Sequence, residues 1–98
     1  MSIQDRRAEI DAIDLELLRL LSRRARLAVK VGESKRTAGL SIGDRTRERE
    51  VIERVRRANT GPLDNQAVVR LFRCIIRESR LVEASAMEHS ISQQKENR

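Results

Sequence analysis

The chain carries three successive amphipathic patterns, of which the first is the longest. Its apolar residues recur every three or four positions, a spacing that predicts one buried stripe along a helix. Ser2 and Asp5 have the spacing of a capping box, so this helix is expected to begin near Ile3 and to run to about Ala38, just before Gly39. The residues of the stripe are Ile10, Ile13, Leu17, Leu20, Leu27 and Val31.

Two further helices are predicted after a loop over residues 39–46. Asp44 or Thr46 is the expected N-cap of the second helix, and Asp64 that of the third. The second helix should end at the Asn59-Thr60-Gly61-Pro62 sequence. Its inward residues are predicted to be Val51, Ile52, Val55 and Ala58, and those of the third helix Val68, Leu71, Phe72, Ile75, Ile76 and Val82. After Met87 the sequence is polar, so residues from about 88 to 98 are expected to form a frayed tail.

The composition agrees with an all-α single domain over residues 1–98. Charged residues make up 37% of the chain, aromatic residues 1%, and glycine and proline together number only five. A first helix of some 35 residues is roughly 50 Å long, whereas a compact chain of this size has a radius of gyration near 13 Å. We therefore expect a dimer in which two long helices share a core.

The net charge of +6 favours an anionic partner, either nucleic acid or a small acid. A lone cysteine, Cys74, excludes an internal disulfide and fits a reducing compartment. No apolar run approaches the roughly 20 residues of a membrane span, and the polar start is unlike a secretory signal, so a cytoplasmic location without a membrane partner is expected. His89 has no partner at metal-ligand spacing, and no metal is predicted.

Charged residues interrupt the apolar stripes at particular positions. Arg24 occupies a stripe position of the first helix, and Lys35 lies on the same line, about 20° away around the helix and roughly 16 Å further along it. A single arginine at such a position is most often an edge residue whose charged end reaches solvent. Two basic residues on the same line of the helix, Arg24 and Lys35, are less easily explained as edge residues.

The other two predicted helices show the same interruption. Glu48 lies three residues before Val51, on the inward face of the second helix, and Ser79 and Glu83 continue the apolar line of the third with a spacing of four. Unpaired buried charges cost several kcal/mol each, so they would be poorly tolerated if scattered. If the side chains converge instead, they compensate one another and form a site for a small anion.

The ordered set of these segments resembles the all-helical chorismate mutases of the AroQ class, over about residues 5–87. Each fragment is weak alone, but their order along the chain is specific. The matching segments are 7–14, 17–24, 27–28, 32–35, 44–50 and 71–79.

This resemblance implies an intertwined homodimer that converts chorismate to prephenate, on the shikimate pathway toward phenylalanine and tyrosine, without a cofactor. Each of its two sites would receive Arg7 from the partner chain. The remaining site residues implied by position are Arg24, Lys35, Asp44, Arg47, Glu48, Ser79 and Glu83. Five of these eight positions, all except Arg7, Asp44 and Arg47, also follow from the interrupted stripes.

The implied roles suit a dianionic substrate. The arginines, helped by Ser79, would clamp the two carboxylates. The substrate would then already be ordered before the rearrangement, which lowers the entropic part of the barrier. Lys35 and Glu83 would stabilise the negative charge that grows on the ether oxygen, and Glu48, with backbone near Asp44, would hold the ring hydroxyl. Glu83 departs from the glutamine that is common in bacterial members, and a glutamate must be protonated to donate a hydrogen bond.

Three alternatives stay open at this stage. An isochorismate pyruvate-lyase has the same fold but lacks the acidic residue after the second-helix arginine, so Glu48 favours the mutase. A 4-amino-4-deoxychorismate mutase is the second alternative, because the ring amine of its substrate would suit the carboxylates of Glu48 and Glu83. A basic helical dimer that binds nucleic acid would explain the charge, but single strands usually stack on aromatic side chains and this chain has only Phe72, so no nucleic acid is expected.

Overall fold

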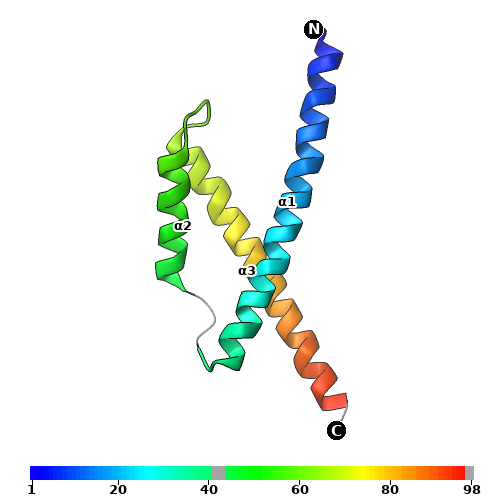
Figure 1. The fold of residues 1–98 in the computed structure, drawn as a ribbon, viewed down its shortest axis with the longest axis vertical. Helices are drawn as coiled ribbons and strands as arrows, with labels where there is room; N and C mark the ends of the chain where they lie inside the picture. Colours follow the sequence, from blue (N-terminus) through cyan, green and yellow to red (C-terminus); the bar gives the residue numbers. More distant parts are fainter. Residues whose placement is uncertain (41–43, 97–98) are drawn as a thin grey trace.

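The computed structural model describes residues 1–40 and 44–96. These residues form three helices and no strand: α1 (Ile3–Thr37), α2 (Arg45–Ala58) and α3 (Asn65–Glu96). Figure 1 shows α1 crossing the middle of α3, with α2 lying beside the first half of α3. The predicted all-α class with a long first helix is therefore confirmed.

The helix starts follow the local chemistry of the sequence. Ser2, Asp44 and Asp64 each accept a hydrogen bond from the backbone amide three residues ahead, at 3.1, 3.1 and 2.7 Å. The amide of Ser2 donates in return to Asp5, which completes the capping box and lowers the pKa of that carboxyl. Of the two predicted caps of α2, Asp44 rather than Thr46 is the one used. Residues 41–43 of the predicted loop lie outside the described residues.

The end of α1 is set by Gly39, whose φ of +73° is a left-handed conformation. This conformation lets the amide of Leu40 donate to the carbonyl of Lys35 at 2.8 Å and the amide of Gly39 donate to that of Arg36 at 3.1 Å. Two carbonyls at the helix end that would otherwise lack partners are thereby satisfied. Lys35 consequently lies in the last turn of a well-terminated helix.

Replacing Gly39 with alanine is expected to lower the free energy of unfolding by about 1 kcal/mol, because a side chain is strained at positive φ. Gly32→Ala is the matched control. A Cβ there would meet Glu83 Oε2 at 3.5 Å, an ordinary contact, and alanine favours a helix interior, so stability should rise by up to about 1 kcal/mol. Chemical denaturation measures both, and equal stability of the two variants would contradict this account.

The core of the isolated chain is small and centred on α3, which contacts both other helices. Among the described residues, Val68 and Ile76 are the buried apolar side chains and Ser79 is the buried polar one. Other members of the predicted inward faces are half-buried, but Leu71, Val82 and Ala58 are exposed, which corrects the prediction for them. Within the described part of the chain, both α1 and α2 pack against α3 and not against each other, so these side chains have no neighbouring helix to cover them.

The apolar stripe of α1, which the sequence predicted to be buried in a core shared by two long helices, is exposed within this single chain. All of its large side chains are between 43% and 58% exposed, and every residue from Met1 to Leu21 is exposed. The first half of α1 extends away from α2 and α3 (Figure 1). The chain accordingly measures 62 Å along its longest axis, with a radius of gyration of 17.6 Å instead of the roughly 13 Å of a compact chain.

The C-terminal segment differs from the frayed tail that the sequence suggested from residue 88 onward. α3 continues as a helix as far as Glu96, and residues 97–98 lie outside the described residues. Because no glycine or proline follows Pro62, nothing in the covalent chain stops the helix. A hydrogen bond of 3.0 Å between the side chains of His89 and Gln93, one turn apart, adds a local contact.

Candidate functional site

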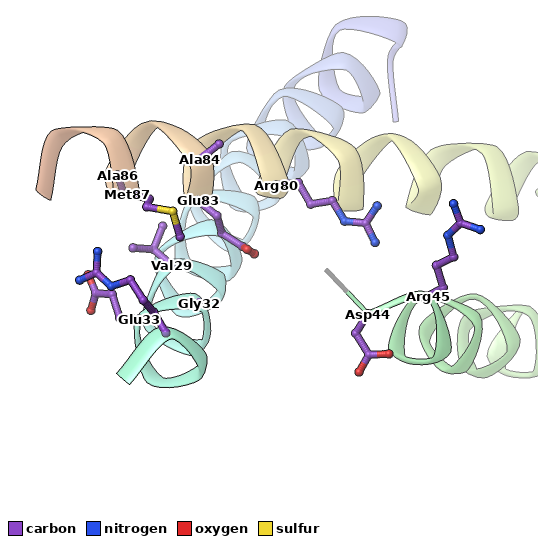
Figure 2. A pocket seen from close by; sticks show the side chains of 11 residues that line it. Val29, Gly32, Glu33, Asp44, Arg45, Arg80, Glu83, Ala84, Ala86 and Met87 are labelled. Atoms are coloured by element: carbon purple, nitrogen blue, oxygen red, sulfur yellow. The ribbon is translucent and has the colours of Figure 1, made fainter. Parts of the chain in front are cut away.

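Two neighbouring clefts lie where the three helices come together. The first, which we call the basic cleft, has a volume of about 280 Å³. Its charged lining residues are Arg24, Lys35, Asp44, Arg47, Glu48 and Arg80. The second, the Glu83 cleft, has a volume of about 470 Å³ and lies between the second halves of α1 and α3 and the start of α2 (Figure 2). Arg80 and Asp44 line both clefts, so the two spaces are adjacent.

The basic cleft gathers positive charge from all three helices. Arg24 and Lys35 come from the same side of α1, as their spacing predicted, and both line this cleft. Arg47 comes from the first turn of α2. Arg24 Nη1 donates a hydrogen bond of 3.1 Å to the hydroxyl of Ser79 on α3, which is only 6% exposed. This contact fixes the arginine across the gap between α1 and α3.

The start of α2 contributes both signs of charge. The carboxylate of Asp44 is engaged by the backbone amide of Arg47, as the helix cap requires. The guanidinium of Arg47 lies 3.4 Å from Glu50 and its side chain is 55% exposed, so it sits at the rim with an exposed charge. Since surface pairs of this kind are weak, an anion entering the cleft can compete for Arg47.

Glu48 is half-buried in the basic cleft, and its partner is a residue that the sequence analysis missed. Arg80 Nη2 donates to Glu48 Oε2 at 2.7 Å, joining α3 to α2. One signal could have found this arginine: it lies four residues after Ile76, a buried residue of the same cleft, and so on the same side of the helix.

Glu83 lies in the Glu83 cleft and does not line the basic cleft, whereas Lys35 lines the basic cleft. The carboxylate of Glu83 approaches Gly32 of α1. A Cβ added at Gly32 would lie 3.5 Å from Glu83 Oε2 (Figure 2). The pair predicted to flank one reacting oxygen is therefore found in adjacent clefts of the isolated chain.

Arg7 is separate from all the other predicted site residues. It lies on the projecting half of α1, is exposed, and lines neither cleft. Seven of the eight predicted residues are therefore brought together around the two clefts by the fold of one chain: Arg24, Lys35, Asp44, Arg47, Glu48, Ser79 and Glu83.

The described residues include no group of three His, Cys, Asp or Glu side chains arranged to hold a metal ion. In the same part of the chain, none of the helices has the length and apolar character needed to cross a membrane.

Comparison with known proteins decides the family. A family model described as chorismate mutase type II matches residues 6–84. The chain belongs to the type II chorismate mutase family. The resemblance drawn from the ordered segments of the sequence is thereby confirmed.

Three relatives illustrate the extent of the similarity. The bifunctional chorismate mutase/prephenate dehydratase of Aquifex aeolicus is 44% identical over 78 residues, covering 76% of this chain and 22% of that protein. The chorismate mutase of Methanocaldococcus jannaschii is 28% identical over 90 residues, 91% of each chain. The solved Form II structure of chorismate mutase from Thermus thermophilus is 35% identical with a TM-score of 0.81, covering 84% of this chain and 93% of that one.

The chain spans about a fifth of the length of the bifunctional relatives that it matches, and nearly the whole length of the archaeal chorismate mutase. The similarity to the bifunctional proteins therefore concerns one part of those proteins.

Proposed function

We propose that this chain is a chorismate mutase that rearranges chorismate to prephenate within a basic cleft, without a cofactor. The observation that carries this proposal is the convergence of Arg24, Lys35 and Arg47 with Glu48 on one cleft of about 280 Å³, in a chain of the type II chorismate mutase family. This volume is close to the lower end of the roughly 300–1,000 Å³ of small-molecule sites.

The first contribution to rate is the ordering of the substrate. Chorismate is a dianion whose enolpyruvyl arm must fold over the ring before the new bond can form. Arg24, held by Ser79, and Arg47, exposed at the rim, would bind the carboxylates. Holding both carboxylates in the folded arrangement removes much of the entropic barrier before the reaction begins.

The second contribution is electrostatic. Negative charge grows on the ether oxygen as its bond to the ring carbon breaks, and a fixed cation such as Lys35 lowers the energy of that state. Glu83, when protonated, would donate a second hydrogen bond from the adjacent cleft. Glu48 would hold the ring hydroxyl through Oε1, since its Oε2 is engaged by Arg80. No proton transfer or covalent intermediate is required.

We also propose that the working unit is an intertwined homodimer. The chain exposes 8348 Å², whereas a folded monomer of its mass exposes about 5,700 Å². The large apolar side chains of the α1 stripe account for part of this excess, and such a continuous patch normally marks an interface. A second copy packed along α1 would cover the stripe and carry its Arg7 to the basic cleft.

The proposed activity is tested by incubating the purified protein separately with chorismate, isochorismate and 4-amino-4-deoxychorismate. Formation of prephenate from chorismate, at the highest kcat/KM of the three, is the expected result. Pyruvate release from isochorismate as the preferred reaction would identify a lyase, and preference for the amino compound would identify the other mutase. Retention on DNA or RNA without any turnover would support a nucleic-acid-binding protein instead.

Substituting Glu83 with glutamine is expected to keep kcat/KM at or above the wild-type value. A carboxylic acid can donate a hydrogen bond to the ether oxygen only when it is protonated, whereas the amide of glutamine always donates. Steady-state kinetics of both proteins with chorismate provides the measurement. If the variant loses most of the activity, Glu83 does not have this role.

A further inference from the structure

One ion pair in the described part of the chain joins two helices. The other pairs there lie within a single helix, between residues at most four apart. Arg80 of α3 and Glu48 of α2 meet at 2.7 Å, and the Glu48 side chain is only 28% exposed. Figure 2 shows Arg80 reaching from α3 toward the start of α2. The pair therefore links the two helices in the wall of the basic cleft.

We propose that Arg80 is a positioning residue that acts through Glu48: it fixes the carboxylate and balances its charge, so that the cleft fits a dianion. This inference rests on the proposed function. Arg80 binds Oε2 through a single nitrogen, Nη2, and so leaves Oε1 of Glu48 available to a substrate hydroxyl. Without Arg80, the Glu48 side chain would be free to occupy several rotamers. Substrate binding would then have to restrict it to one rotamer, and the entropy lost in doing so would weaken the binding.

The charges of the basic cleft support the same role. Arg24, Lys35, Arg47 and Arg80 oppose Asp44 and Glu48, which leaves a formal net charge of +2 from this chain, a positive charge that suits a dianionic substrate. Removing the charge of Arg80 lowers the net charge to +1. In the Glu48→Gln background the same change lowers it from +3 to +2. The net charge therefore falls by one in both backgrounds, and the prediction that the loss of Arg80 matters only while Glu48 is a carboxylate comes from the positional argument.

A purely structural role predicts a different outcome. Arg80 is 44% exposed, and ion pairs that open to solvent contribute little to stability. The contact between α2 and α3 is not limited to this ion pair, and the apolar side chains of Val51 and Ile76 line the same cleft from the two helices. Loss of Arg80 should therefore affect substrate binding well before it affects folding.

The experiment compares Arg80→Gln, Glu48→Gln and the double variant, with chorismate as substrate and the thermal midpoint Tm as a folding control. Arg80→Gln is expected to lower kcat/KM by about 10-fold, mainly through KM, because the interaction with the hydroxyl is present before the transition state. In the Glu48→Gln background the same change should cost less than about 2-fold, as expected for two residues that act as a unit. Tm should fall by less than about 5 °C.

Two further variants sharpen the test. Arg80→Lys should recover most of the loss, since one nitrogen suffices for the contact. Arg77→Gln is the matched control on the same helix: its side chain is 69% exposed and its ion pair is with the adjacent Glu78, so its KM should be unchanged.

Equal losses from Arg80→Gln in both backgrounds, or no loss in either, would overturn the inference while leaving the proposed function intact. An unchanged KM together with a large fall in Tm would also overturn it, in favour of a structural role. Absence of chorismate turnover in the wild-type protein would overturn the proposed function and this inference with it.

Discussion

Co-refolding equal amounts of Arg7→Ala and Lys35→Ala chains is expected to restore about a quarter of the wild-type activity, although each variant alone should be inactive. In a mixed dimer, one site combines an intact Lys35 with an intact Arg7, and the other site lacks both. Half of the dimers are mixed after random pairing, so one site in four is complete. The chorismate turnover of the mixture, compared with that of each variant, is the measurement.

The structural basis for this expectation is the position of Arg7, which is exposed on the projecting half of α1 and lines neither cleft of its own chain. Wild-type chains co-refolded with Lys35→Ala serve as the control and should retain about half of the activity, because only the Lys35→Ala sites are lost. An inactive mixture of the two variants, or an Arg7→Ala protein that is fully active alone, would rule out the exchange of Arg7 between chains.

Truncating Arg47 or Glu48 to alanine is expected to lower kcat/KM by about 10²-fold or more, since both side chains line the basic cleft, where we propose that they orient the substrate. Arg49→Ala is the matched control in the same turn of α2. Its side chain is exposed and does not line the basic cleft, so this variant should stay within about 2-fold of wild type. Steady-state kinetics with chorismate gives the comparison.

Equal losses for Arg47→Ala and Arg49→Ala would mean that the general positive charge of α2 attracts the substrate, with no specific clamp. In that case the losses should also shrink at high salt, because contacts between exposed charges are screened. A specific clamp in the partly enclosed cleft should be less sensitive to salt.

Much of the site could be predicted because a helix has a fixed period. Arg24 and Lys35 share a phase on α1, and Glu48 lies on the inward face of α2, so the angular position of each followed from counting residues. The same reasoning located Ser79 and Glu83 on α3. Asp44 and Arg47 have no such periodic signal, and they came only from the resemblance to the family.

The sequence could not show how the helix faces meet. The spacing of four residues between Ile76 and Arg80 indicates only on which side of α3 this arginine lies, and its pairing with Glu48 exists only because α2 lies beside α3. The separation of Lys35 and Glu83 into adjacent clefts has the same origin, since it depends on the angle at which α1 crosses α3.

The three helices, the N-caps of α1 and α3 and the phase of the charged residues on each helix were specified by the sequence alone, because hydrogen bonding at helix ends and the helical period are local properties of the chain. The sequence also specified that α1 would carry an apolar stripe, but not what would cover that stripe. The exposure of the stripe within one chain and the contact of Arg80 with Glu48 became visible in the folded arrangement of the helices. Both depend on contacts between segments far apart in sequence, which the local pattern of residues does not encode.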